Sequence, residues 1–288
     1  MGLSPINAIA AAQIAIYVPY LLIAILLASR HGFRRNAGWL YLLLFTLTRL
    51  IAASLQLSTT STPPTPALLI TTQIFYGIGL STLLLTLLNL LGRLLSSTTT
   101  TKTIFTPRHQ RLAQIVVVIG LTLGIVGSSL TASQIDSIMS GQTPFGILEI
   151  PIESQIGLGL IIAGFAGWMI GVGTCWVDYK GVGEKKLLWG LTATMPFMIV
   201  RVVFSGLGTF GYDPRFRGFG GSEEYAWWFL GMAVMMEVIV VGILEGVGLT
   251  LKRVENRGSN GSGRRGIGDA YNDPIHEKGP ETEPKGNI

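Results

Sequence analysis

Charge and cysteine are both scarce in this 288-residue chain, in which charged residues make up 13% and cysteine occurs once, as Cys175. Soluble domains carry roughly 25% charged residues. The low charge, together with a mean hydropathy of +0.51, argues against a soluble protein and indicates a membrane protein. A single cysteine excludes a disulfide bond within the chain.

The sequence also lacks the residue patterns that carry most catalytic and metal chemistry. The three histidines, His31, His109 and His276, fall in predicted loops or in the tail, so no intramembrane metal constellation is predicted. There is no Walker A, G-x-S-x-G or H-E-x-x-H motif. Glu237 has no second carboxylate at its depth with which to share acid–base work. We therefore predict no catalytic residue, metal ligand or cofactor, which argues against an enzyme without deciding the question.

The net charge of +5 does not indicate nucleic-acid binding. The basic residues lie in short connections between apolar runs, and they form no continuous basic face. Nucleic acid is therefore not predicted as a partner, whereas the lipid bilayer is.

Long apolar runs dominate what the sequence does contain. A spanning helix needs about 20 mostly apolar residues, and these runs lack the period-2 alternation of strands in a membrane barrel. The sequence therefore predicts an all-α fold, a seven-helix transmembrane bundle. The predicted spans are 7–29, 37–57, 67–95, 112–132, 154–177, 187–209 and 225–250.

The distribution of basic residues predicts the orientation of the bundle, because cytosolic connections are enriched in Lys and Arg. The first, third and fifth connections and the start of the tail are basic. The stretches 58–66 and 133–153 contain no Lys or Arg, and only 210–224 mixes both signs. This alternation predicts an N-terminus outside and a C-terminus in the cytosol, in a multi-pass protein whose membrane the sequence does not identify.

The composition changes near residue 252. Residues 1–252 form the predicted membrane domain. Residues 253–288 are rich in Gly, Ser, Pro and mixed charges, which leaves no apolar face to bury, so we predict a disordered cytosolic tail. The tail contains the sequon N-G-S at 260–262, which a cytosolic segment cannot present for glycosylation.

Three charged residues lie deep within the apolar spans: Arg49, Arg201 and Glu237. At 1.5 Å per residue, Arg49 and Arg201 lie roughly 17 and 21 Å from the predicted cytosolic end, and Glu237 lies about 16 Å from the outer end. Each unpaired charge at that depth costs about 2.5–3.5 kcal/mol on insertion scales. We therefore predict that the three converge inside the bundle. Their formal sum of +1 suits an anionic group such as a carboxylate or a lipid phosphate.

Other polar residues in the spans extend this hypothesis. Gln56, Gln73 and Asn89 are candidate members of the ligand-binding cluster, or else each makes an interhelical hydrogen bond. Glu245 lies near the predicted cytosolic end, where it is expected to snorkel or to pair with Lys252 or Arg253.

Pairs of glycines spaced four residues apart indicate close helix packing within the bundle, because small residues let backbones approach in a membrane. They occur in the fourth, fifth and seventh spans, and nothing in them predicts an oligomeric state. The pairs are Gly120 and Gly124, Gly167 and Gly171, and Gly242 and Gly246.

Several stretches resemble a family of uncharacterised fungal integral membrane proteins, defined by a domain of unknown function with seven predicted spans. They are "RHGFRRNAGW", "LTRLIAASLQL", "PFMIVRVVFS" and "MMEVIVVGILEGVGL". The resemblance covers about residues 3–252, and Arg49, Arg201 and Glu237 match the family's intramembrane charges. It implies a membrane location and no known activity.

Two functional hypotheses from different classes remain open. In the first, the protein is receptor- or transporter-like and its buried polar cluster binds a small or lipidic ligand, with anionic ligands among the candidates. In the second, it is a structural or membrane-organising protein whose buried charges only fix helix packing.

Overall fold

The computed structural model describes residues 4–31, 37–60, 65–96, 106–131, 134, 150–177, 184–211, 214–216 and 225–251. Within these ranges, seven helical segments are long and apolar enough to cross a membrane, and no strand occurs. The prediction of an all-α, seven-helix bundle is therefore confirmed. The elements are α1 (Pro5–His31), α2 (Ala37–Ser58), α3 (Pro66–Ser96), α4 (Pro107–Leu130), α6 (Ile152–Val177), α7 (Lys185–Phe210), η2 (Pro214–Phe216), α8 (Ala226–Phe229), η5 (Leu230–Val234) and α9 (Met235–Thr250).

The fourth span shows why hydropathy locates a membrane crossing better than a helix end. The predicted span begins at residue 112, whereas α4 begins at Pro107. Proline suits the first turn of a helix, where its missing N–H has no helical partner to lose. The polar turn that follows, which includes Arg108 and Arg111, is helical without being apolar.

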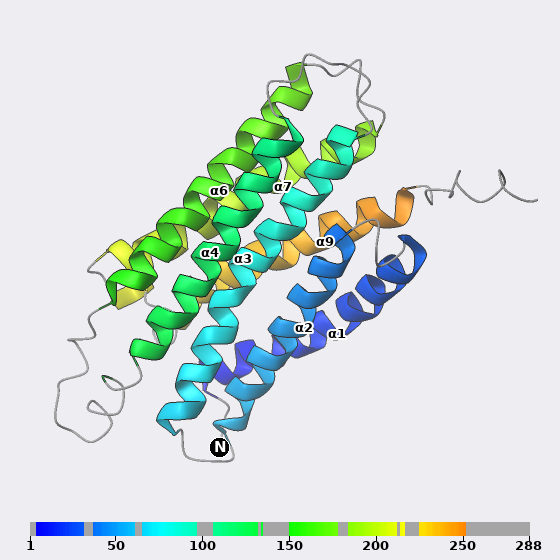
Figure 1. Ribbon diagram of the computed structural model, residues 1–288. Helices are drawn as coiled ribbons and strands as arrows, with labels where there is room; N and C mark the ends of the chain where they lie inside the picture. The colour runs from blue at the N-terminus through cyan, green and yellow to red at the C-terminus, as the bar shows by residue number, and fades with distance from the viewer. Residues whose placement is uncertain are drawn as a thin grey trace, which may run out of the picture. The chain divides into compact units, whose positions relative to one another are not determined.

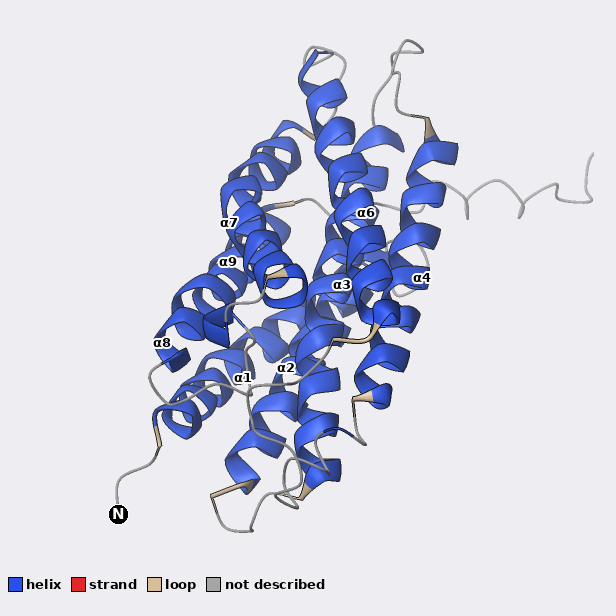
Figure 2. Cartoon of the chain, turned by 90° about the vertical axis from the view of Figure 1, so that its left-hand side faces the viewer, coloured by secondary structure: helices blue, strands red, loops and turns tan. Residues whose placement is uncertain are grey.

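Helices that are neighbours in sequence pack against one another, and α9 returns to contact α1. The exception to this simple order is α3, which contacts α2, α4, α6 and α7. Figure 1 shows α3 between the α1–α2 pair and the α4–α6 pair, and Figure 2 gives the view turned by 90°. Of the apolar window in α3, 72% is buried, against 17% in α4. The third span is therefore the core helix of the bundle.

The outward faces of the peripheral helices are apolar, as a bilayer requires. Leu22 on α1 and Leu112 on α4 are 63% and 60% exposed. Most of the interior is apolar as well, with a cluster of leucines on α3 packed with large side chains such as Trp168. A bundle that is apolar outside and largely apolar inside suits lipid and not water.

Helices α4 and α6 approach each other closely, and their backbones meet at glycines. A Cβ on Gly120 would lie 2.7 Å from the Gly157 carbonyl oxygen, and a Cβ on Gly157 would lie 2.9 Å from the Gly124 nitrogen. The predicted tight packing is confirmed here. It is not seen at Gly246, where a Cβ would meet nothing within 4 Å.

The chain divides into two units, Met1–Arg253 and Val254–Ile288. The second unit lies outside the described residues, as do Lys252 and Arg253. The disordered cytosolic tail and the orientation of the two termini therefore stay predictions.

Candidate functional site

The three intramembrane charges meet in the centre of the bundle. Oε1 of Glu237, on α9, accepts a hydrogen bond from Nη2 of Arg49 on α2, and another from Nε of Arg201 on α7 at 2.7 Å. Exposure is 1% for Arg49 and Glu237 and 6% for Arg201. The predicted convergence is confirmed, and its cause is that pairing offsets the cost of burying each charge.

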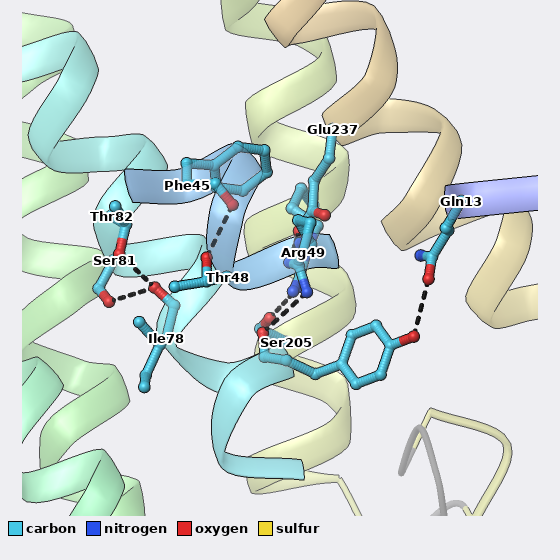
Figure 3. Close-up of polar contacts among 11 residues, drawn as sticks. Gln13, Phe45, Thr48, Arg49, Ile78, Ser81, Thr82, Ser205 and Glu237 are labelled. Atoms are coloured by element: carbon cyan, nitrogen blue, oxygen red, sulfur yellow. Dashed lines mark hydrogen bonds and ion pairs between the residues drawn. The ribbon is translucent and has the colours of Figure 1, made fainter. Parts of the chain in front are cut away.

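Arg49 is held on every side by protein. Its Nη1 donates to the Tyr76 carbonyl oxygen at 3.2 Å. Its Cζ lies 5.3 Å from the centroids of both the Phe45 and the Tyr76 rings, within cation–π range. Space for the guanidinium comes from Gly79 on α3, since a Cβ there would clash with Nη2. Figure 3 shows Arg49 and Glu237 pointing toward one another between these helices.

Arg201 has different surroundings. Besides Glu237, it donates through Nη1 to the Ser205 hydroxyl one turn along α7, and its Cζ lies 6.0 Å from the Phe204 ring. Among the described residues, no hydrogen bond is recorded for its Nη2. The two arginines and one glutamate sum formally to +1, so the cluster carries an uncompensated positive charge.

A pocket of about 250 Å³ lies beside this charge and includes Arg201 in its wall. Four helices supply nearly all of the lining: α3, α4, α6 and α7. The lining comes from the first half of α3 and α6 and from the second half of α4 and α7. That half of the bundle is the one predicted to face outward. The polar side chains in the lining, apart from Arg201, are Gln73, Tyr76, Ser128, Thr131, Ser154, Ser205 and Thr209.

The three candidate polar companions fall in three different places. Gln73 lines the pocket. Gln56 donates to Asn7 Oδ1 at 2.9 Å, an interhelical bond of the kind predicted, which ties α2 to α1 away from the charges. Asn89 donates to the Leu85 carbonyl oxygen of its own helix at 2.7 Å. The interhelical bond predicted for Asn89 is therefore wrong, because the preceding turn of α3 supplies the acceptor.

Glu245 is also placed differently from the prediction. It lies two turns beyond Glu237 on α9 and is 2% exposed, so it does not snorkel. Neither carboxylate oxygen has a hydrogen-bond partner among the described residues. The predicted partners Lys252 and Arg253 lie outside that part of the chain.

Residues 3–254 match a family described as a domain of unknown function, DUF7702. This chain belongs to the DUF7702 family. The match spans the whole predicted membrane domain and confirms membership of an uncharacterised family. No curated protein and no solved structure matches the chain. The fungal source that the resemblance implies stays a prediction.

Some features of this DUF7702 site have no clear signal in the sequence. Gly79 is one of many glycines in apolar runs, and only the fold shows that Arg49 needs its missing side chain. The π-helical turn η5, which ends three residues before Glu237, has no composition that marks it, although such turns often lie near functional sites. Ser205 was predictable, since residues four apart share a helix face.

Proposed function

We propose that this protein binds a small anionic ligand with an apolar body, in the pocket beside Arg201. The observation that carries the proposal is that the two arginines have different surroundings. Arg49 is enclosed by Glu237, Tyr76 and Phe45, whereas Arg201 shares Glu237 and borders a cavity. A surplus positive charge beside an apolar cavity with a few polar groups is the usual composition of a site for such a ligand.

The volume of the pocket limits the ligand class. An apolar cavity of about 150 Å³ accommodates benzene, so the 250 Å³ here suits a molecule modestly larger than benzene. A benzoate or a medium-chain carboxylate has that size, with one anionic oxygen pair for the guanidinium and an apolar remainder for the lining. Ligand binding at mid-membrane depth fits a receptor- or transporter-like role.

The alternative is that the charges serve packing alone. The burial of Arg49, with a hydrogen bond to the α3 backbone and an ion pair to α9, favours this role for Arg49 in particular. A buried ion pair fixes helix register whether or not a ligand binds. The two roles are compatible when Arg49 positions Glu237 and Arg201 meets the ligand.

Binding of octanoate and benzoate to the purified protein in detergent micelles tests the proposal by calorimetry. We expect both to bind, and the neutral octan-1-ol and benzyl alcohol to bind at least tenfold more weakly, because about 1.4 kcal/mol is tenfold and a charged hydrogen bond contributes about 1.5–3 kcal/mol. Arg201→Gln should abolish this preference for the anion, whereas Arg108→Gln, at an exposed site on α4, should leave it unchanged.

A pair of glycine substitutions keeps the test decisive if Arg201→Gln fails to fold. Gly124 lines the pocket, and a Cβ there meets nothing within 4 Å, so Gly124→Leu should fill the cavity without disturbing the charges. Gly173→Leu is the matched control, because its Cβ also has open space and it is not part of the pocket lining. Equal octanoate affinity in both leucine variants, or none in the unmodified protein, would contradict the proposal and favour the packing role.

A further inference from the structure

The cytosolic half of the bundle, as predicted from its basic loops, is closed by an ion pair between α3 and α7. Arg93, in the last turn of α3, donates through Nε to Glu184 Oε2 at 2.9 Å and through Nη2 to Oε1 at 2.7 Å. Glu184 immediately precedes α7. The pair therefore joins, at one end of the molecule, the same two helices that line the pocket toward the other end.

This ion pair has two hydrogen bonds and is partly buried. The contact is bidentate, which fixes the relative position of the two helix ends. Glu184 is 25% exposed at its side chain and Arg93 is 8% exposed, so water reaches the carboxylate more readily than the guanidinium. Separation of the two helix ends must therefore also expose Arg93 to water, because an unpaired buried charge is costly.

Between the pocket and the ion pair, leucines fill much of the interior, alongside the buried polar side chains Thr86 and Thr194. The leucines on α3 and α7 are fully buried there. The leucines are Leu83, Leu84, Leu87, Leu88, Leu91, Leu187, Leu188 and Leu191.

The helix that joins the two ends contains a weak point. Pro196 lies inside α7, five residues before Arg201 and twelve after Glu184. Proline has no N–H, so the Thr192 carbonyl loses its usual helical donor, and a helix bends most readily at such a position. The half of α7 that carries Arg201 can therefore tilt relative to the half that follows Glu184.

We infer that α7 transmits occupancy of the pocket across the membrane by releasing the Arg93–Glu184 ion pair. This inference rests on the proposed ligand binding. An anion at Arg201 competes with Glu237 for the same guanidinium and so favours a position of α7 in which that contact is loosened. Displacement of α7 about Pro196 then separates Glu184 from Arg93 and opens the bundle between α3 and α7 at the far end. The ligand shifts the equilibrium because it interacts differently with the two states.

Distances between spin labels on the far end test this inference in the full chain, in nanodiscs. With Cys175→Ala as background, labels at Ser96 and Lys186, both exposed, report on α3 against α7. We expect octanoate to shift their distance distribution outward by about 5 Å, the scale of one helical turn. Glu184→Gln should produce the same shift without octanoate, because it removes one charge of the ion pair. Labels at Ser96 and Arg108, which report on α3 against α4, should show no shift.

Two further variants separate the steps. Pro196→Ala should leave octanoate affinity within about twofold of the unmodified protein and remove the shift, since it restores the missing N–H. The double exchange Arg93→Glu with Glu184→Arg should restore the short distance that Glu184→Gln loses. If octanoate binds with the expected dependence on Arg201 and the label distance stays fixed, the inference is overturned and the proposed binding function stands. An unchanged label distance in Glu184→Gln overturns the inference as well. If the unmodified protein does not bind octanoate, both the inference and the proposed binding function are overturned.

Discussion

Arg49 and Arg201 carry the same functional group on different helices, and their surroundings differ. Arg49 lies against a backbone carbonyl, two aromatic rings and a carboxylate, all supplied by protein. Arg201 shares that carboxylate and borders a cavity. At the scale of the residue, the proposed ligand contact therefore belongs to Arg201, and Arg49 is proposed to serve packing.

The two glutamates of α9 allow a matched prediction at this scale. Glu237→Gln should destabilise the protein by about 3–5 kcal/mol, because it leaves two buried guanidinium groups facing a neutral amide. Glu245→Gln should change stability by less than about 1 kcal/mol or raise it, because the Glu245 carboxyl group has no hydrogen-bond partner among the described residues that the substitution could remove. Thermal unfolding in detergent, followed by circular dichroism, measures both. An equal loss of stability in the two variants would contradict the conclusion that Glu237, unlike Glu245, is held by ion pairs.

At the scale of the element, α4 and α6 differ from the other helix pairs because their backbones meet at glycines. Without a hydrophobic drive between helices in lipid, such close contact supplies much of the packing energy. The pocket depends on this contact, since both helices contribute to its wall. A change in the spacing of α4 and α6 should therefore alter both stability and binding.

Gly120 and Gly124 test the importance of that spacing. Gly120→Ala should cost about 1–3 kcal/mol, because the new methyl group would lie 2.7 Å from the Gly157 carbonyl oxygen and force the helices apart. Gly124→Ala, one turn along the same face, adds its methyl group to open space, and stability should stay the same or rise slightly. Thermal stability of the two variants measures the difference, and similar values would show that the α4–α6 contact adapts without cost.

At the scale of the whole molecule, the predicted orientation decides which surface the pocket serves. The basic connections predict a cytosolic C-terminus, which places the pocket in the outer half and the Arg93–Glu184 pair in the inner half. Under the opposite orientation, the pocket would face the cytosol, and transmission would run outward.

The sequon at 260–262 gives a direct test of the orientation. Asn260 should remain unmodified when the full chain is expressed in a glycosylating host, because a cytosolic tail never meets the transferase. A sequon engineered into the 133–153 connection should be used, provided that it lies far enough from the membrane. Electrophoretic mobility before and after glycosidase treatment reports both results. A glycan on Asn260 would reverse the orientation of the whole bundle.

Much of the fold follows from the sequence without the structure. Seven runs of about 20 apolar residues determine the seven helices. In lipid, every backbone N–H and C=O group needs a hydrogen-bond partner within the protein, and a helix supplies these partners within a single run. The intramembrane positions of Arg49, Arg201 and Glu237 determine that these charges turn inward, since each is costly when it faces lipid. Both conclusions need only local composition and the thickness of a bilayer.

Only the tertiary structure decided which charge meets which, and where the cavity lies. Helix order and rotation about each axis depend on contacts between residues far apart in the sequence, such as Gly79 with Arg49 and Gly120 with Gly157. The same holds for the Arg93–Glu184 pair, whose members look like ordinary charges at helix ends. Lipid is as apolar as the protein interior, so hydrophobicity alone cannot select the inward face of a helix. Steric fit between helices makes that selection, and one sequence read in isolation does not display it.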